Sequence, residues 1–381
     1  MTEANMRGVS GCWQVAVIAV LLAACGGKKQ DEAATKASAP EEKVVNVFNW
    51  SDYIGDTTVA DFEKKAGIKV TYDVFDSNEV LETKLLAGRT GYDIVVPTAP
   101  FLERQIKAGV FLKLDKSKLP NLANMDPDIM QRVAAHDPGN DYSINYLWGT
   151  IGIGYNPDMV RKALGTESID SWSAILEPRN AAKLAKCGIA MLDAPTDVFG
   201  SVAIYKGLDP NSEKPEDLAV VEETLMKVRP HIRYFHSSSY INDLAAGEIC
   251  VALGWSGDVL QARDRGAAAA NPVKVAYAIP KEGAINYFDM LAIPADAPHP
   301  GKAHEFLNFL MEPAVIAQVT NKVRFANGNS ASLQLVDEAI RNDPNIYPSA
   351  EVRARLHPDL AESQAFSRDL NRSWTRIRTG Q

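Results

Sequence analysis

The stretch Phe48-Asn49-Trp50-Ser51-Asp52-Tyr53 decides how the rest of the chain is interpreted. It ends an apolar run that starts at Val44, and the pattern of this run predicts a buried β-strand. A helix over residues 57–66 is expected next, with Asp56 as its N-cap and Gly67 at its end. Open α/β sheets bind ligands where strands end and helices begin, so this stretch is the first candidate site.

The same stretch places two aromatic rings, Trp50 and Tyr53, close in sequence to the carboxylate of Asp52 and the hydroxyl of Ser51. The face of an aromatic ring attracts a cation, and a carboxylate fixes the cation by a charged hydrogen bond. The stretch therefore favours a site for an organic cation. The alternative is a polar turn with core aromatic residues, and this stretch alone does not decide between the two.

Length and composition indicate a globular protein that is large enough for two domains. The chain has 381 residues, of which 46% are hydrophobic and 23% are charged. Its net charge of -8 argues against nucleic acid as a partner and mildly favours a cationic ligand.

The first residues resemble the signal peptide of a bacterial lipoprotein. Arg7 precedes an apolar run, Val15 to Ala24, that is too short to span a bilayer. The run leads into Leu22-Ala23-Ala24-Cys25-Gly26, which is similar to a lipobox, a pattern whose cysteine is lipidated and becomes the mature N-terminus. We predict a lipoprotein signal peptide over residues 1–25 and a flexible tether over residues 26–43. The alternative is an ordinary signal peptide with an incidental Cys25.

The four cysteines divide into two groups. Cys12 lies in the predicted signal peptide and Cys25 is the predicted lipid anchor, so Cys187 and Cys250 remain. Two such thiols in an exported protein more often pair than stay free, and we predict a disulfide between them. A metal site is not expected, because there is no second pair of thiols.

Predicted strands and helices alternate beyond residue 43. Strands are expected at residues 68–75, 92–96, 141–148, 150–156, 189–192, 249–253 and 287–293. This alternation predicts a doubly wound α/β fold. We expect two lobes, residues 44–142 with about 285–312 and residues 143–284 with about 313–381, around a cleft that closes by hinge motion.

Three segments share one arrangement, in which an apolar strand is accompanied by an aromatic residue and a carboxylate. They are Phe48–Tyr53, Trp255–Asp258 and Tyr287–Asp289. A strand end with a capping aspartate is the ordinary explanation for each one alone. Together they favour a ligand with two or more ammonium groups separated by methylenes, because rings cover the alkyl stem while carboxylates pair with the ends. Unpaired buried carboxylates are costly, so we expect the empty site to be open and wet.

Signatures of enzymes are weak. The segment Gly254-Trp255-Ser256-Gly257 is one residue short of the nucleophile elbow. Pro157 stands where a dinucleotide-binding loop that begins at Gly152 needs its third glycine. The six histidines lack metal-ligand spacing, whereas paired carboxylates for glycoside hydrolysis remain an open alternative. We expect no catalytic residue, no cofactor and no metal.

Several segments, taken in order, resemble the periplasmic polyamine-binding proteins of ABC transporters, and most closely their putrescine-binding branch. The resemblance covers nearly the whole chain from Val44 to the C-terminal tail. The segments that carry it are Asn49–Ile54, Tyr72–Leu81, Asp93–Pro97, Leu192–Pro195, Arg233–Ser238, Tyr240–Leu244, Ile279–Gly283 and Phe325–Asn327.

The resemblance implies a two-lobed periplasmic-binding fold of the second type, with the ligand between the lobes. It places ligand contacts at Trp50, Ser51, Asp52, Tyr53, Thr98, Asp197, Trp255, Asp258, Tyr287, Asp289 and Phe325. It implies that Trp255 and Tyr287 enclose the methylene chain, while Asp258 and Asp289 hold one ammonium group. It assigns Asp52, Ser51 and Asp197 to the far end, partly through water, and it also supports the Cys187–Cys250 pairing.

Three positions depart from the pattern of putrescine binders. Phe325 replaces a tyrosine, Asp197 replaces a glutamate and Thr98 replaces a serine. The first two changes alter the polar end of the pocket, so they bear on the length of the ligand more than on its class.

The resemblance implies a periplasmic binding protein, without catalytic activity and expected to be a monomer, that delivers polyamines to the permease of an ABC importer. The lipobox-like segment adds a lipid anchor at Cys25 to this expectation. Putrescine is the first expectation, with spermidine, cadaverine and agmatine as further ligands. Two alternatives stay open on the sequence: a periplasmic sensor that reports to a membrane receptor, and a hydrolase built on the same fold.

Overall fold

A computed structural model describes residues 42–381 of the chain. The predicted signal peptide, the lipidation site Cys25 and the predicted tether up to residue 41 lie outside the described residues. None of the helices within residues 42–381 is long and apolar enough to cross a membrane.

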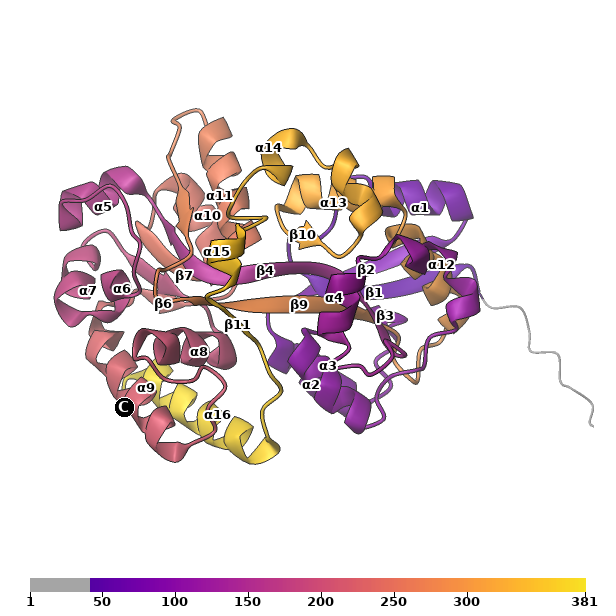
Figure 1. The fold of residues 1–381 in the computed structure, drawn as a ribbon, viewed down its shortest axis with the longest axis horizontal. Helices are drawn as coiled ribbons and strands as arrows, with labels where there is room; N and C mark the ends of the chain where they lie inside the picture. The colour runs from indigo at the N-terminus through magenta and orange to yellow at the C-terminus, as the bar shows by residue number, and fades with distance from the viewer. Residues whose placement is uncertain (1–41) are drawn as a thin grey trace, which may run out of the picture. The chain divides into compact units, whose positions relative to one another are not determined.

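A mixed β-sheet forms the centre of the fold (Figure 1). Its main path runs β2-β1-β3-β9-β4-β7-β5-β6, while β8 and β10 pair with β4 and β11 pairs with β9. The strands are β1 (Val44–Trp50), β2 (Lys69–Phe75), β3 (Ile94–Val95), β4 (Ser143–Tyr155), β5 (Ile189–Met191), β6 (Tyr234–Phe235), β7 (Val251–Trp255), β8 (Ala276–Ala278), β9 (Ala284–Ala292), β10 (Ala326–Asn327) and β11 (Leu356–Pro358).

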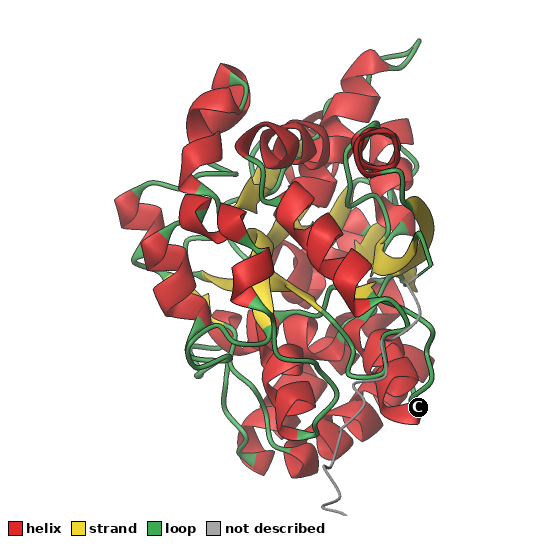
Figure 2. Cartoon of the chain, turned by 90° about the vertical axis from the view of Figure 1, so that its right-hand side faces the viewer, coloured by secondary structure: helices red, strands yellow, loops and turns green. Residues whose placement is uncertain are grey.

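Helices cover both faces of this sheet (Figure 2). They are α1 (Thr58–Ala66), α2 (Asn78–Ala87), α3 (Ala99–Lys107), α4 (Pro127–Val133), α5 (Pro157–Leu164), α6 (Ser173–Leu176), α7 (Pro178–Leu184), α8 (Pro195–Tyr205), α9 (Pro215–Val228), α10 (Ser239–Ala246), α11 (Ser256–Ala268), α12 (Pro300–Leu310), α13 (Pro313–Val323), α14 (Glu338–Arg341), α15 (Ala350–Arg353) and α16 (Gln364–Thr379). Many of them begin at proline, whose fixed φ and missing N–H suit the first helical position.

The parallel strand pairs confirm the predicted α/β class. β1 pairs in parallel with β2 and with β3, and β5 pairs in parallel with β6 and with β7. In the first group Trp50 lies opposite Phe75, so the carboxyl ends of β1 and β2 meet at one edge of the sheet. The turns that follow these strands therefore lie close together, as the first candidate site requires.

The two strands expected at residues 141–148 and 150–156 are one strand, β4. Its first part pairs with β9 and its second part with β7 and β8, so it carries the sheet from one group of strands to the other. Gly149 does not interrupt it, because an extended glycine is accommodated in a strand. The predicted lobe limits at residues 143 and 285 fall at the starts of β4 and β9, and these limits stay a prediction.

The beginning of α1 differs from the expectation. Thr57, not Asp56, precedes the helix, and no side chain caps it. The carboxylate of Asp56 instead pairs with the ammonium of Lys322 at 2.7 Å, in α13. The predicted end is confirmed, because Gly67 adopts the left-handed conformation with φ of 65° and its N–H donates to the carbonyl of Glu63.

A disulfide joins Cys187 and Cys250, as predicted. Cys187 follows α7, and the fully buried Cys250 precedes β7. The bond therefore fixes the start of the strand that ends at Trp255.

Replacing both cysteines by alanine should lower the free energy of unfolding by about 4 kcal/mol, because the bond closes a loop with a sequence separation of 63. Urea unfolding of the oxidised protein and of the double variant measures this difference. Reduction of the wild-type protein is the matched control and should give a similar loss. Equal stabilities of the three forms would contradict the prediction.

Candidate functional site

The structure brings ten of the eleven predicted ligand residues to one cavity, namely Trp50, Ser51, Tyr53, Thr98, Asp197, Trp255, Asp258, Tyr287, Asp289 and Phe325. Asp52 is the exception. The wall is completed by six residues that were not predicted: Phe75, Asp76, Asn78, Ser237, Ser238 and Ile241.

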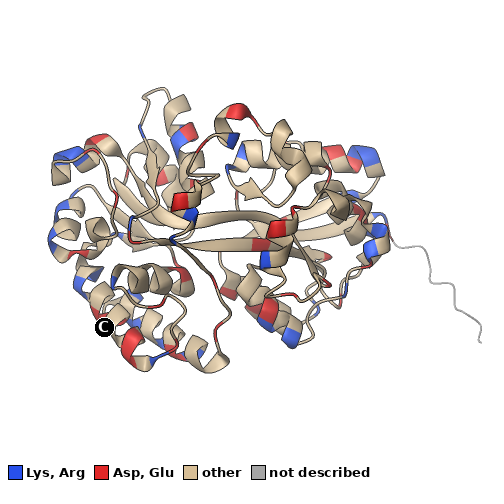
Figure 3. Ribbon diagram, in the orientation of Figure 1, with Lys and Arg blue, Asp and Glu red and all other residues tan. Residues whose placement is uncertain are grey.

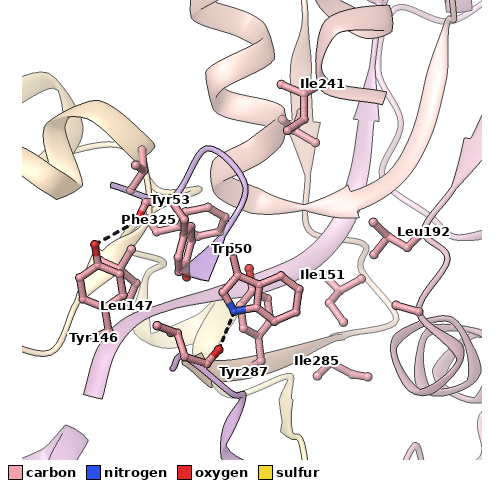
Figure 4. Packing of buried hydrophobic residues seen from close by; sticks show 14 of the residues in the cluster. Trp50, Tyr53, Tyr146, Leu147, Ile151, Leu192, Ile241, Ile285, Tyr287 and Phe325 are labelled. Atoms are coloured by element: carbon pink, nitrogen blue, oxygen red, sulfur yellow. Dashed lines mark hydrogen bonds between the residues drawn. The ribbon is translucent and has the colours of Figure 1, made fainter. Parts of the chain in front are cut away.

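Trp50 forms part of the wall at the end of β1. Its indole N–H donates to the carbonyl of Val96 at 2.8 Å, which fixes the orientation of the ring (Figure 4). The ring packs against Phe75 with centroids 4.6 Å apart. On the opposite wall Trp255 meets Trp50 edge to face at 5.6 Å, so strand ends from both groups of strands meet across the cavity.

Asp289 is the most deeply placed acid of this site. It lies on β9, is 3% exposed, and accepts a hydrogen bond of 2.5 Å from the hydroxyl of Tyr53. Its second carboxylate oxygen, Oδ1, is buried without a hydrogen-bond partner. A buried acceptor of this kind is costly to leave unsatisfied, so the carboxylate can still take a donor from a ligand.

Asp258 has a similar environment on the opposite wall. It lies in the first turn of α11, is 5% exposed, and accepts a hydrogen bond of 2.8 Å from the hydroxyl of Tyr240. The same hydroxyl accepts the backbone N–H of Trp255 at 3.2 Å. Tyr240 therefore positions the carboxylate and the preceding strand end together.

Burial raises the pKa values of both carboxyl groups. The pKa of Asp289 rises to about 8 because of desolvation, against the lowering effect of the Tyr53 hydrogen bond, and the negative charges of Asp197 and Asp258 raise it further. The pKa of Asp258 rises to about 7, again chiefly by desolvation and against the Tyr240 hydrogen bond. A bound cation would reverse this cost, since an opposite charge favours the ionised form.

Asp197 lies in the first turn of α8 and accepts a hydrogen bond of 2.8 Å from the indole N–H of Trp255. Desolvation raises its pKa to about 6, and the Trp255 hydrogen bond opposes the rise. The carboxylate therefore orients one wall of the cavity while it faces the same space as Asp289.

Phe325 enters the site because two glycines leave room for its ring. A Cβ atom at Gly257 would lie 2.3 Å from the ring, and one at Gly149 would lie 3.0 Å from it. The ring packs against Tyr53 with centroids 5.0 Å apart. Figure 4 shows Phe325 beside Tyr53, whose carbonyl accepts the hydroxyl of Tyr146.

Asp52 does not line the cavity. Its carboxylate pairs with the guanidinium of Arg265 at 2.8 Å, and its backbone carbonyl accepts the side-chain amide of Gln261 at 3.3 Å. The backbone at Asp52 has a φ of 54°, a conformation that aspartate tolerates better than most residues. Asp52 thus joins the turn after β1 to α11 on the far side of the cleft.

Some of the additional wall residues had a signal in the sequence. Phe75 ends β2, and Asp76 and Asn78 follow it. Since β2 is parallel to β1, these residues meet the candidate stretch at the same edge of the sheet. The amide oxygen of Asn78 also accepts the backbone N–H of Thr98 at 3.1 Å. Ser237 and Ser238 precede α10, and Ile241 lies in its first turn.

The sequence matches one protein-family model over most of its length. Residues 57–348 match the model of the bacterial extracellular solute-binding protein. The chain belongs to this family. Its fold is accordingly the two-lobed type II fold of periplasmic solute-binding proteins.

Two characterised relatives of this solute-binding protein are similar over nearly their whole length. The chain is 53% identical to the putrescine-binding periplasmic protein SpuD of Pseudomonas aeruginosa, over 91% of this chain and 94% of that protein. It is 49% identical to the putrescine-binding periplasmic protein PotF of Escherichia coli, over 100% of both chains.

Two solved structures share the fold. The spermidine/putrescine ABC transporter substrate-binding protein PotD of Streptococcus pneumoniae has a TM-score of 0.71 and 26% identity, over 88% of this chain and 99% of that one. The lipoprotein Tp0655 (TpPotD) of Treponema pallidum has a TM-score of 0.72 and 26% identity, with the same coverage.

The site combines buried acids with neutral hydrogen-bond donors. Its carboxylates are held by neutral hydroxyl and indole donors, and burial raises the pKa values of Tyr53, Tyr240 and Tyr287 well above that of a free tyrosine, so they stay protonated donors. Across residues 42–381 there is no group of His, Cys, Asp and Glu side chains placed to hold a metal ion.

The raised pKa values predict how the stability of the ligand-free protein depends on pH. Between about pH 4, near the value for an unfolded aspartate, and about pH 8, folded Asp289 holds a proton that the unfolded chain has lost. The free energy of unfolding should therefore fall as pH rises through this window, by about 1.4 kcal/mol per pH unit for this group.

Asp289→Asn should reduce this slope, because an amide does not titrate, and the variant should be more stable than the wild type at pH 8. Urea unfolding between pH 4 and pH 8, after bound amines have been removed by unfolding and refolding, tests this. Asp170→Asn, at a side chain 76% exposed, is the matched control and should keep the wild-type slope. Equal slopes for all three proteins would contradict the prediction.

Proposed function

We propose that this chain binds a polyamine in the cavity and delivers it to the permease of an ABC importer. The observation that carries the proposal is the pair of buried carboxylates, Asp258 and Asp289, which line a cavity walled by aromatic rings. Neither forms an ion pair with a lysine or arginine within residues 42–381, although the charge of Arg265 lowers the pKa of Asp258 slightly against the larger effect of burial. An ammonium group supplies both the positive charge and the donors that these carboxylates lack.

The aromatic walls suit the methylene chain of such a ligand. Trp255 and Tyr287 come from different strands, and both line the cavity. We assign them to enclose the chain, with one ammonium group at Asp258 and Asp289 and the other end toward Asp197 and Ser51. We assign the remaining ligand contacts to Trp50, Tyr53, Thr98 and Phe325. Asp52, which pairs with Arg265 outside the cavity, is assigned an indirect contact at the rim of the site.

Putrescine is the first candidate, with spermidine, cadaverine and agmatine as further ones. The names of SpuD and PotF support a putrescine-binding role, and the name of the Streptococcus pneumoniae protein supports a role in an ABC transporter. These names favour transport over sensing and binding over catalysis. Figure 3 shows acidic and basic residues interspersed over the helices, and the net charge of -8 argues against nucleic acid as a partner.

The two buried carboxylates provide the direct test. The wild-type protein should bind one putrescine in a calorimetric titration, while Asp258→Ala and Asp289→Ala should each weaken binding at least about a hundredfold. The reason is that each change removes a partner of a buried ammonium, which typically costs about 3–5 kcal/mol.

Asp170→Ala is the matched control, because it removes the same charge from an exposed position. Circular dichroism should show that all three variants are folded. Wild-type affinity in either cavity variant would rule out the assigned site, and no heat from the folded wild type with any polyamine would rule out the proposed function.

We further propose that the protein is a monomer held at a membrane, facing the periplasm, by a lipid on Cys25. The lipobox-like sequence supports the anchor, and so do a solved relative described as a lipoprotein and two relatives described as periplasmic. Acyl chains bind membranes in proportion to their buried methylenes.

Cys25→Ser should abolish incorporation of a labelled fatty acid and move the protein from the membrane fraction to the soluble fraction. Cell fractionation and labelling measure both effects. Cys12→Ser, which lies within the predicted signal peptide, is the matched control and should leave both unchanged. A labelled, membrane-bound Cys25→Ser protein would contradict the anchor.

A further inference from the structure

Strand β4 contains a register shift of the β-bulge type opposite the acid Asp289. Asn145 lies opposite Met290 and Leu147 lies opposite Asp289, so Tyr146 has no residue opposite it on β9. A bulge adds one residue to a strand and changes the direction of nearby side chains, and bulges are frequent next to functional sites. The two bulge residues, Asn145 and Tyr146, are 2% and 1% exposed, so their contacts are made inside the protein.

Asn145 holds the backbone at Asp289. Its side-chain amide donates to the carbonyls of Asp289 on β9 and Leu147 on β4, each at 3.2 Å, so it bonds to both strands where the register shifts. The Oδ1 atom of Asn145 is buried without a hydrogen-bond partner, a cost that an apolar side chain of similar size would avoid. A Cβ atom at Gly328 would lie 2.3 Å from this oxygen, so the neighbouring chain is built around the Asn145 side chain.

Tyr146 holds the backbone at Tyr53. Its hydroxyl donates to the carbonyl of Tyr53 at 2.9 Å (Figure 4), and the two rings meet edge to face with centroids 5.7 Å apart. The same carbonyl also accepts the side-chain amide of Asn49 at 3.3 Å. Tyr53 lies in the turn after β1, so the hydroxyl of Tyr146 joins this turn to β4.

The contacts of Asn145 and Tyr146 converge on one hydrogen bond of the cavity. The hydroxyl of Tyr53 donates to Oδ2 of Asp289 at 2.5 Å. Tyr146 fixes the backbone of the donor residue, and Asn145 fixes the backbone of the acceptor residue. Neither Asn145 nor Tyr146 lines the cavity. An effect of these two residues on a ligand therefore passes through the cavity residues that they contact.

We propose that Asn145 and Tyr146 are positioning residues of the binding site, which hold Asp289 and Tyr53 in the arrangement that receives an ammonium group. The inference rests on the proposed function and adds to it two residues that do not touch the ligand. In this arrangement Tyr53 occupies Oδ2 of Asp289, while Oδ1 has no partner and is available to the ligand.

Tyr146→Phe is the first test, because phenylalanine keeps the ring and removes only the hydroxyl. We expect this variant to bind putrescine about fivefold more weakly than the wild type in a calorimetric titration, since the Tyr53 carbonyl loses one of its two donors. Tyr277→Phe is the matched control. Tyr277 is also buried, its hydroxyl donates to the carbonyl of Thr150 on β4 at the same distance of 2.9 Å, and it does not line the cavity. The control should keep the wild-type affinity.

The pH dependence of binding separates positioning from a general loss of stability. Burial raises the pKa of Asp289, and the hydrogen bond from Tyr53 lowers it. The charges of Asp197 and Asp258, which the variants leave unchanged, raise it further. A weaker hydrogen bond from Tyr53 therefore raises this pKa, and a cation binds best to the ionised form. Between about pH 5 and about pH 9, the loss of affinity on acidification should begin at higher pH in Tyr146→Phe than in the wild type and in the control.

A double-variant cycle tests the same route. In a Tyr53→Phe background the hydroxyl that Tyr146 positions is absent, so adding Tyr146→Phe should weaken putrescine binding less than about twofold. Asn145→Leu, which has a similar size but no amide, tests the other residue of the bulge. It should weaken putrescine binding about tenfold in the wild-type background, because the Asp289 carbonyl loses the amide donor.

Wild-type affinity in Tyr146→Phe, an unchanged pH profile or an equal loss in both backgrounds would overturn the inference. Wild-type affinity in a folded Asn145→Leu protein would overturn the role of Asn145. Thermal unfolding checks the folding of each variant, and Tyr146→Phe decides if Asn145→Leu does not fold. A wild-type protein that binds no polyamine would overturn the proposed function itself, whereas putrescine binding that Tyr146→Phe leaves unchanged would overturn this inference alone.

Discussion

The burial of Asp258 and Asp289, with no ion pair to either acid within residues 42–381, is the constraint on which the site depends. Each carboxylate receives one hydrogen bond from a tyrosine hydroxyl, from Tyr240 and Tyr53 respectively. One hydrogen bond from a neutral hydroxyl replaces only part of the stabilisation that water gives to a carboxylate. The pKa values of both acids are therefore raised. The empty cavity therefore holds a stored electrostatic cost, and a bound cation relieves it.

The sheet explains how these groups come together. β4 pairs with β9 along one part and with β7 along the next, so Asp289 on β9 and Trp255 at the end of β7 are placed by one strand. Two glycines make room for one aromatic wall of the cavity, because the ring of Phe325 occupies the space that Gly149 and Gly257 leave free. A rigid sheet thus fixes the spacing of the walls, while the turns at the strand ends supply the polar groups.

The sequence predicted the parts of the site that have a local signature. An apolar strand with an aromatic residue and an acid can be recognised in a short window, and the three such segments all reach the cavity. Long-range pairings have no such signature. The contact of Asp52 with Arg265 depends on the approach of α11 to the turn after β1. The helix cap assigned to Asp56 failed for the same reason, because Lys322 of the distant α13 competes for its carboxylate.

The contact between Asp52 and Arg265 also shows which interactions govern recognition. It bridges the cleft, but both side chains are about a third or more exposed, at 43% and 34%, and pairs of this kind contribute roughly 0–1 kcal/mol. Losing one partner of a buried ion pair costs about 3–5 kcal/mol. A pair this exposed contributes too little free energy to select a ligand. In the proposed site, selection falls instead to the buried acids Asp258 and Asp289, because a cation offsets the desolvation of their carboxylates and a neutral ligand does not.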